Sequence, residues 1–139
     1  IMSSDSRAGA VGGVKETKNP ILLARYVMEQ TPYVFLIGEK ADQFASQQGL
    51  EKVPNTYFMT RKRLQGWQQA AKNEKNQNRK AEMKKLELGT VGAVAFDQAG
   101  DLAAATSTGG INYKMAGRVG DSAVIGSGTY ANKYCAVSC

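Results

Sequence analysis

The chain of 139 residues contains no histidine, so it lacks the side chain that most often serves as a general base or a metal ligand. Cysteine is scarce: Cys135 and Cys139 are four positions apart in an apolar segment, which is neither a CxxC motif nor an obvious disulfide pair, and we expect buried thiols. No run approaches the ~18 apolar residues of a membrane span, and no basic segment leading into an apolar one opens the chain. These absences predict a soluble, cytoplasmic protein with no catalytic cofactor; because the first residue is Ile1, a lost signal peptide is the alternative.

Positive charge is in excess, with 18 Lys and Arg against 12 Asp and Glu, a net charge of +6 and a pI near 9.4. Nine of the basic residues lie between Arg61 and Lys85, mixed with Glu74, Glu82 and several amides. Such a mixture is typical of a solvated helix or linker rather than of a nucleic-acid-binding face. We therefore expect no nucleic-acid or membrane partner, and a basic non-enzymatic binding module is the distant alternative.

The first half of the chain has the pattern of short helices and strands in one domain. Asn19 and Pro20 form a helix start, a capping residue followed by proline at the first helical position. The expected elements are a short strand within 1–13, a helix over about 20–30, a buried strand over 33–37, a helix over 39–47 and a helix over about 60–71 with Leu64, Trp67 and Ala71 on its apolar side. The polar residues at about 72–88 lose this periodicity and predict a mobile linker.

Beyond the linker the composition changes to that of β-structure. The nearly continuous apolar run at 91–96 predicts a strand buried on both faces, and the DQAGD segment at 97–101 predicts a hairpin turn leading to a return strand at 102–108. Residues 109–120 have a loop composition, and 123–139 contain two more apolar runs separated by GSGTYANK. Helices and strands come in blocks, which favours an α+β or layered architecture over a doubly wound sheet.

The Gly89–Thr90 pair at the head of the first strand is the candidate reactive point. A threonine hydroxyl is a weak nucleophile and needs an adjacent base, which an N-terminal threonine finds in its own α-amine, of pKa about 7.7–8.0. Such an amine exists only after the bond between Gly89 and Thr90 is cut. Glycine before the threonine lets the backbone adopt strained conformations and leaves the carbonyl uncrowded. The alternative is a glycine that ends a loop and a threonine that starts a strand.

Other polar residues are expected near Thr90. The hairpin brings the end of the return strand close to it, and Thr106 and Thr108 share one face of that strand while Ser107 points away. In GRVGDS, Arg118 can bind a carboxylate bidentately and Asp121 can accept an ammonium group, so together they could recognise an amino acid. The alternative is an Arg and Asp pair that only staples a loop.

The motifs GTVGAVAFD, LAAATSTGG, GRVGDS and GTYAN, in this order and spacing, resemble the plant-type L-asparaginase and isoaspartyl peptidase family of N-terminal nucleophile hydrolases. The upstream segment from AGAVGG to DQFA is similar to the helical stretch of that family, so the resemblance covers nearly the whole chain. TSTGG and GTYAN favour this branch over the alternatives, the glycosylasparaginases and threonine aspartases.

The resemblance implies hydrolysis of L-asparagine to aspartate and ammonia, of β-aspartyl dipeptides, or of both. It implies cleavage between Gly89 and Thr90, with 1–89 as part of an α-subunit and 90–139 as the start of a β-subunit. Thr90 is then the nucleophile and Thr108 assists it, while the segment Arg118, Val119, Gly120 and Asp121 binds substrate. The implied fold is a four-layer αββα sandwich, assembled as a dimer of αβ units.

The chain also departs from the family pattern. Family members begin with an apolar strand and a His-Gly-Gly segment, followed by a loop that binds a structural sodium ion, and none of these precedes Ile1. A Thr-Gly-rich motif expected after Cys139 is also missing. We therefore expect the chain to be an incomplete portion of the sandwich, with no metal ligand of its own.

Overall fold

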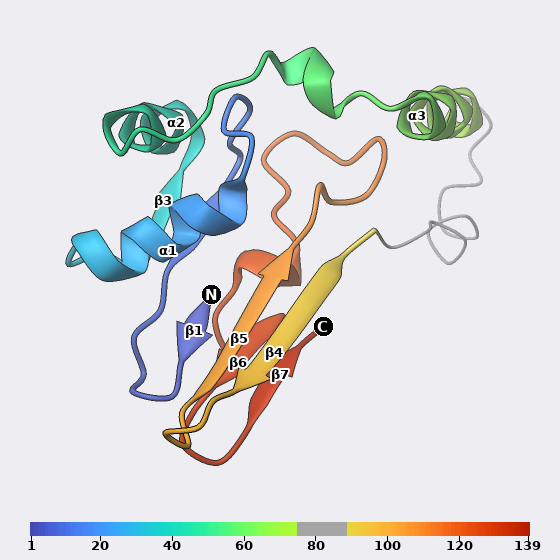
Figure 1. Cartoon of the computed structure of the whole chain (residues 1–139). Helices are drawn as coiled ribbons and strands as arrows, with labels where there is room; N and C mark the ends of the chain where they lie inside the picture. Colours follow the sequence, from blue (N-terminus) through green and yellow to red (C-terminus); the bar gives the residue numbers. More distant parts are fainter. Residues whose placement is uncertain (75–88) are drawn as a thin grey trace.

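The computed structural model describes residues 1–74 and 89–139, which fold into an α+β arrangement (Figure 1). The helical and strand pattern of the sequence is recovered in the same order along the chain. Within the described ranges the elements are β1 (Met2–Ser3), β2 (Ala10–Gly12), α1 (Pro20–Gln30), β3 (Phe35–Ile37), α2 (Gly38–Gln47), η1 (Asn55–Phe58), α3 (Arg61–Glu74), β4 (Val91–Phe96), β5 (Leu102–Ser107), η3 (Asp121–Ala123), β6 (Thr129–Ala131) and β7 (Ala136–Ser138).

The β4–β5 hairpin belongs to a three-stranded antiparallel sheet in the order β1-β5-β4, in which β5 is the central strand. Its turn is as predicted: the backbone N–H groups of Ala99 and Asp101 each donate to Asp97 Oδ1 at 2.9 Å, and Gly100 has φ +89°. This turn fixes the register, which pairs Phe96 with Leu102 and Val91 with Ser107. The residues just beyond Val91 and Ser107 therefore meet at the open end of the hairpin.

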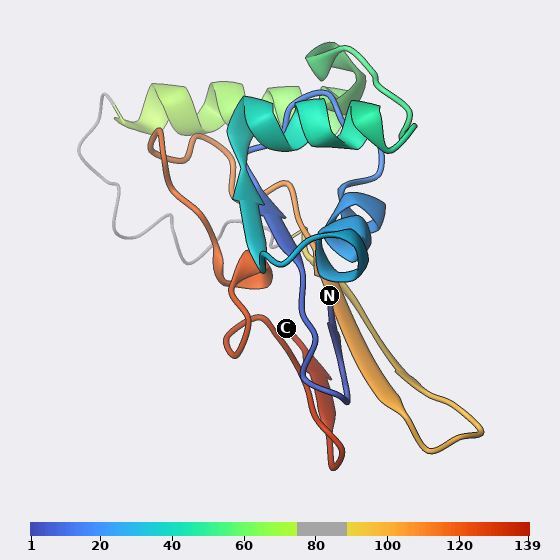
Figure 2. The ribbon, with the colours of Figure 1, turned by 90° about the vertical axis from the view of Figure 1, so that its left-hand side faces the viewer.

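The β6–β7 hairpin lies against one face of the β4–β5 hairpin (Figures 1 and 2). A side chain at Gly92 would collide with Ser138 Oγ, so glycine permits this close approach. Met2, Ala104 and Ala131 form a small apolar core here. Strand β7 lies in the second of the two apolar runs noted in the sequence, whereas β6 lies inside the GSGTYANK segment that separates them.

Helices α1 and α2 enclose a second core around the parallel pair β2 and β3. Pro20 opens α1 as predicted, although the side chain of Asn19 makes no capping hydrogen bond. The core buries Leu23 of α1 with Ala41 and Ala45 of α2. Gly9 packs so closely on α1 that a Cβ would lie 2.7 Å from the backbone nitrogen of Met28. In these two helices, one apolar side of each thus forms the core.

A buried carboxylate fixes the loop between β2 and α1. Asp42, only 5% exposed, accepts hydrogen bonds from Thr17 Oγ1 and from the backbone N–H groups of Lys15, Glu16 and Thr17. Burial raises the pKa of Asp42, but these four hydrogen bonds outweigh it and leave the pKa below the ordinary value of 3.8. The carboxylate therefore joins α2 to this loop in its charged form.

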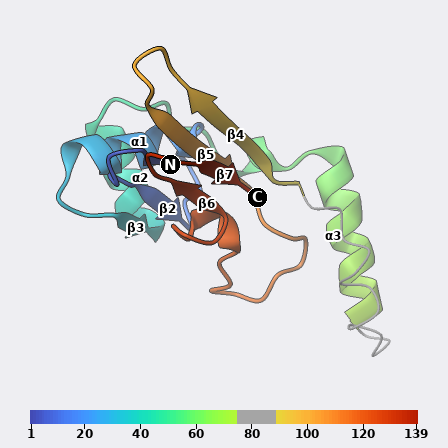
Figure 3. The same cartoon turned by 90° about the horizontal axis from the view of Figure 1, so that it is seen from below.

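The predicted burial of the strands was wrong. Every residue of β4 is exposed, with Phe96 at 73%, and β4 is the edge strand that pairs only with β5 among the described residues (Figure 3). Phe35 and Ile37 of β3 are also exposed. Cys135 and Cys139, expected to be buried, are exposed free thiols. Apolar composition reports a tendency to be buried, whereas burial itself needs a packing partner, which the described part of the chain does not supply for these side chains.

Helix α3 extends to Glu74, so residues 72–74 of the expected linker are helical, and residues 75–88 lie outside the described residues. Its predicted apolar side is right only in part, because Leu64 and Trp67 are exposed whereas Ala71 is half-buried. The half-buried positions are Arg63, Gly66, Ala70 and Ala71. The helix lies beside the loop at 109–120 (Figures 1 and 2), where Gly66 approaches Asn112 and the Trp67 ring meets that of Tyr113.

Candidate active site

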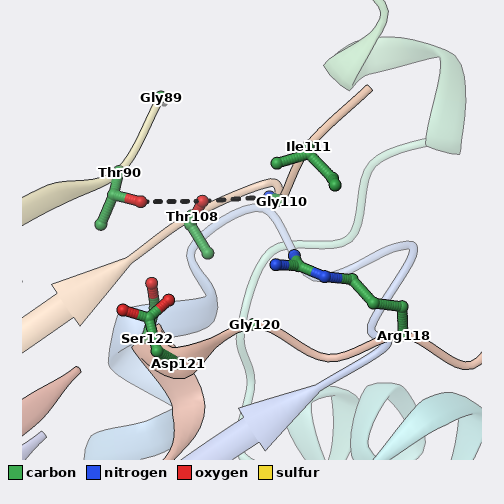
Figure 4. A pocket seen from close by; sticks show the side chains of 9 residues that line it. All are labelled: Gly89, Thr90, Thr108, Gly110, Ile111, Arg118, Gly120, Asp121 and Ser122. Carbon is green, nitrogen blue, oxygen red and sulfur yellow. Dashed lines mark hydrogen bonds between the residues drawn. The ribbon is translucent and has the colours of Figure 1, made fainter. Parts of the chain in front are cut away.

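The open end of the β4–β5 hairpin brings the two threonines together. Thr90 directly precedes β4 and Thr108 directly follows β5, so the pairing of Val91 with Ser107 makes them neighbours. The Thr90 hydroxyl donates to Thr108 Oγ1 at 3.3 Å, and the backbone N–H of Gly110 donates to the same oxygen at 3.0 Å (Figure 4). Thr108 Oγ1 therefore accepts a hydrogen bond from the candidate nucleophile and another from a loop amide.

A small open pocket lies beside the two hydroxyls (Figure 4). The Asp121 carboxylate and the Ser122 hydroxyl point toward Thr108 from one side, and the guanidinium of Arg118 points in from another (Figure 4). The pocket is lined by Gly89, Thr90, Thr108, Gly110, Ile111, Arg118, Gly120, Asp121 and Ser122. A possible nucleophile, a cation and a carboxylate thus face one space, as the recognition of a zwitterionic amino acid requires.

A tight turn positions Asp121. Its backbone oxygen accepts from the N–H of Val124 at 2.8 Å and from the N–H of Gly128 at 3.1 Å. Gly128 has no room for a side chain, because a Cβ there would lie 2.6 Å from the carbonyl carbon of Asp121 and 2.6 Å from the Cα of Ser122. The glycine of the GTYAN motif therefore fixes the place from which the Asp121 carboxylate enters the pocket.

Buried hydroxyl groups connect this turn to the hairpin. Thr129 Oγ1, fully buried, lies 2.6 Å from Thr106 Oγ1 and 3.1 Å from the backbone oxygen of Ser122. Thr106 Oγ1 in turn donates to the backbone oxygen of Gly128 at 2.8 Å and lies 2.6 Å from Ser138 Oγ. These bonds join β5, which leads to Thr108, to the turn that carries Asp121. The Thr106 side chain therefore bonds to the β6–β7 hairpin and the residue before it. It does not face Thr90, contrary to our expectation.

Arg118 and Asp121 do not form an ion pair with each other in the structure described here, and both residues are exposed. The structure therefore does not support the alternative in which Arg118 and Asp121 pair with each other to hold the loop together. Both groups are available to a ligand in the pocket. Val119, placed in the substrate-binding segment by the sequence, does not line the pocket and is 50% exposed.

The sequence reading missed Gly110, Ile111 and Ser122. Ser122 is the most unusual of the three, because it is 5% exposed and its hydroxyl has no hydrogen-bond partner among the described residues. Its position next to Asp121 in the GRVGDS motif was the available signal. Ile111 follows two glycines in a loop and carries no signal that a sequence alone would single out.

The described residues include no group of three or more His, Cys, Asp or Glu side chains that could hold a metal ion. The sodium ion that the family resemblance implies stays a prediction. No helix within residues 1–74 and 89–139 is long and apolar enough to cross a membrane.

The arrangement is that of a candidate nucleophile site at the open end of a β-hairpin in an α+β fold. The profile of the asparaginase family matches residues 1–139, and the chain belongs to that family. It is 49% identical over 137 residues to the isoaspartyl peptidase of Escherichia coli K12, covering 96% of this chain and 43% of that protein. It is 49% identical over 131 residues to the isoaspartyl peptidase/L-asparaginase of Homo sapiens, covering 92% and 41%, and 50% identical over 128 residues to that of Rattus norvegicus, covering 92% and 38%. The chain thus spans less than half the length of these curated relatives.

Proposed function

We propose that this chain carries the nucleophile of a threonine amidohydrolase that cleaves itself between Gly89 and Thr90 and then hydrolyses L-asparagine, β-aspartyl dipeptides or both. One observation carries the proposal: the hydroxyls of Thr90 and Thr108 and the side chains of Arg118 and Asp121 border a single pocket. The printed names of the relatives, isoaspartyl peptidase and isoaspartyl peptidase/L-asparaginase, support the choice of substrates.

In the self-cleavage step, Thr90 Oγ1 attacks the carbonyl carbon of Gly89. The hydroxyl proton passes to the departing backbone nitrogen of Thr90, and the C–N bond breaks to leave an ester between Gly89 and the Thr90 side chain. Water then hydrolyses the ester, which gives a carboxylate on Gly89 and restores the hydroxyl of Thr90. The step creates the free α-amine that the later reaction uses as its base.

In the hydrolytic step, the α-amine of Thr90 takes the proton of its own hydroxyl as Oγ1 attacks the substrate's side-chain carbonyl carbon. The proton is passed to the leaving group, which departs as ammonia from asparagine or as the amine of a β-aspartyl dipeptide. Water activated by the same amine then resolves the acyl-enzyme and releases aspartate. Thr108 orients the nucleophile, because its oxygen accepts a hydrogen bond from the Thr90 hydroxyl at 3.3 Å.

Arg118 and Asp121 bind the parts of the substrate that do not react. The guanidinium takes the α-carboxylate and the carboxylate takes the α-ammonium, both of which are present in asparagine and in a β-aspartyl residue. Gly120, of the same segment, also lines the pocket, whereas Val119 does not. Because asparagine and a β-aspartyl residue share the two groups that Arg118 and Asp121 bind, one site can serve both kinds of substrate.

The finer architecture belongs to the same proposal. The β4–β5 and β6–β7 hairpins packed face to face are two central layers of a four-layer αββα sandwich, with residues 1–89 in the α-subunit and 90–139 opening the β-subunit. The exposed apolar side chains of β4 support this, since a further layer would cover them. The assembly we propose is a dimer of αβ units, and the cytoplasmic location stays a prediction from the sequence.

A substrate panel tests the activity. The full-length protein and its Thr90→Ala variant are assayed with L-asparagine, a β-aspartyl dipeptide and glycosylated asparagine. We expect turnover of one or both of the first two substrates by the wild type and none by the variant. Activity on glycosylated asparagine alone would reassign the enzyme to the glycosylasparaginase branch, and equal activity of Thr90→Ala would remove Thr90 as the nucleophile.

A further inference from the structure

The guanidinium of Arg63, on the first turn of α3, packs directly on Gly89, the residue whose carbonyl is cut in the proposed self-cleavage. A Cβ on residue 89 would collide with Arg63 Nη2 and would lie 3.0 Å from Arg63 Cζ. The cation therefore occupies the space that any side chain other than glycine would need. Arg63 and Gly89 are 26 positions apart, so this contact is a property of the tertiary fold.

Other contacts hold α3 in the same place. The ring of Trp67, one helical turn beyond Arg63, meets the ring of Tyr113 edge to face with centroids 5.7 Å apart. Gly66 lies so close to the Asn112 side chain that a Cβ would collide with it. At the start of the helix, the backbone N–H of Arg63 donates to Thr60 Oγ1 at 3.3 Å. Arg63, Gly66 and Trp67 recur at helical spacing and therefore share one face of α3. That face contacts both the loop at 109–120 and Gly89.

Arg63 is less exposed to solvent than the two basic residues that precede it on α3. Arg61 and Lys62 are exposed, as expected for a solvated basic run, whereas Arg63 is half-buried. Withdrawing a guanidinium from water costs free energy unless it gains a compensating interaction. The guanidinium packs on Gly89, and the peptide carbonyls there are acceptors of the kind that a group with five N–H donors and no acceptor needs.

We propose that Arg63 is a positioning residue for cleavage of the Gly89–Thr90 bond, an inference that rests on the proposed function. By packing on Gly89 it holds the scissile carbonyl against the Thr90 hydroxyl, which Thr108 orients from the other side. In the tetrahedral intermediate the carbonyl oxygen becomes negative, and a fixed guanidinium beside Gly89 favours that charge. One of the nine basic residues between Arg61 and Lys85 thus acts in maturation, although the sequence predicts a solvated face or linker for the group as a whole.

The experiment follows the conversion of freshly made full-length protein into two fragments, by mass spectrometry of quenched samples. Arg63→Met keeps the length of the side chain and removes its charge, and Arg61→Met on the exposed side of α3 is the matched control for the loss of one charge. We expect cleavage to slow by at least about tenfold in Arg63→Met and partial recovery in Arg63→Lys, because small misplacements of reacting groups carry penalties of that size. Arg61→Met should cleave at the wild-type rate, and the thermal midpoints of the two Met variants should agree.

A double-mutant cycle tests the contact itself. Gly89→Ala should slow cleavage severely with Arg63 present, and much less in an Arg63→Ala background, where the added methyl has room. Equal effects of Gly89→Ala in both backgrounds, or equal rates for Arg63→Met and Arg61→Met, would overturn the role of Arg63. Those outcomes leave the proposed function intact, because the wild type still cleaves; a wild type that stays uncut overturns self-cleavage itself.

Discussion

Replacing Thr108 with valine removes one hydroxyl and keeps the shape of the side chain. In the structure the Thr90 hydroxyl donates to Thr108 Oγ1 at 3.3 Å, beyond the usual range for two hydroxyls, so the bond is weak in the resting chain. Such a neutral bond contributes about 0.5–1.5 kcal/mol. When Thr90 attacks, charge develops on the pair and the bond tightens, and hydrogen bonds to charged groups contribute about 1.5–3 kcal/mol. At about 1.4 kcal/mol per factor of ten, Thr108→Val should lower kcat/KM by about 10- to 150-fold.

The assay is release of ammonia from L-asparagine by the full-length protein, with the rate divided by the amount of cleaved chain measured by mass. That division separates an effect on hydrolysis from an effect on maturation. Thr108→Ser retains the oxygen and should recover most of the activity. If Thr108→Val hydrolyses asparagine within about twofold of the wild-type rate per cleaved chain, the 3.3 Å contact does not orient the nucleophile.

Three further predictions concern the support of the site and the fold. Ser122→Ala removes a buried hydroxyl that has no partner, so the free energy of unfolding should stay equal or rise by up to about 1 kcal/mol in a urea titration, and a fall would show a hidden partner. Gly128→Ala places a methyl group against the backbone of Asp121 and should raise KM for asparagine by about tenfold at the same content of cleaved chain, while an unchanged KM would separate this turn from substrate binding. The buried Asp42 carboxylate accepts four hydrogen bonds. Asp42→Asn replaces one of its oxygens with an amide group and should lower the free energy of unfolding by about 2–3 kcal/mol at pH 7. Because folding lowers the pKa of Asp42, the stability that its carboxylate contributes is present above the unfolded pKa and is lost as pH falls through the folded pKa. The difference in free energy of unfolding between the wild type and the Asn variant should therefore shrink below about pH 4. A constant difference down to about pH 2 would contradict this.

The contact of Thr90 with Thr108 could be predicted from the sequence because it depends on local rules. The DQAGD turn sets the register of the hairpin, and the register places the residues at its open end side by side. GRVGDS was found for a similar reason, since Arg and Asp in a glycine-flanked turn have a recognisable chemistry. Side-chain alternation alone left Thr106 misplaced, because it does not say which face of the strand meets the pocket, and the resemblance that gave the substrate-binding segment did not separate Val119 from its neighbours.

The features that could not be predicted depend on contacts between distant segments. The apolar run of β4 indicated burial, yet its side chains are exposed because the described chain places no layer over them. The basic cluster indicated a solvated face, yet Arg63 meets Gly89 through the docking of α3 on the pocket loop. Periodicity shows which residues share a helix face, but not which surface that face meets.

The central claim is that Thr90 becomes an N-terminal nucleophile, and the mass of the denatured full-length protein tests it most directly. For the wild type we predict two fragments, one ending at Gly89 and the other beginning at Thr90, and for Thr90→Ala a single uncut chain without activity. A wild-type protein that hydrolyses asparagine or a β-aspartyl dipeptide while its mass is that of one uncut chain would contradict the account.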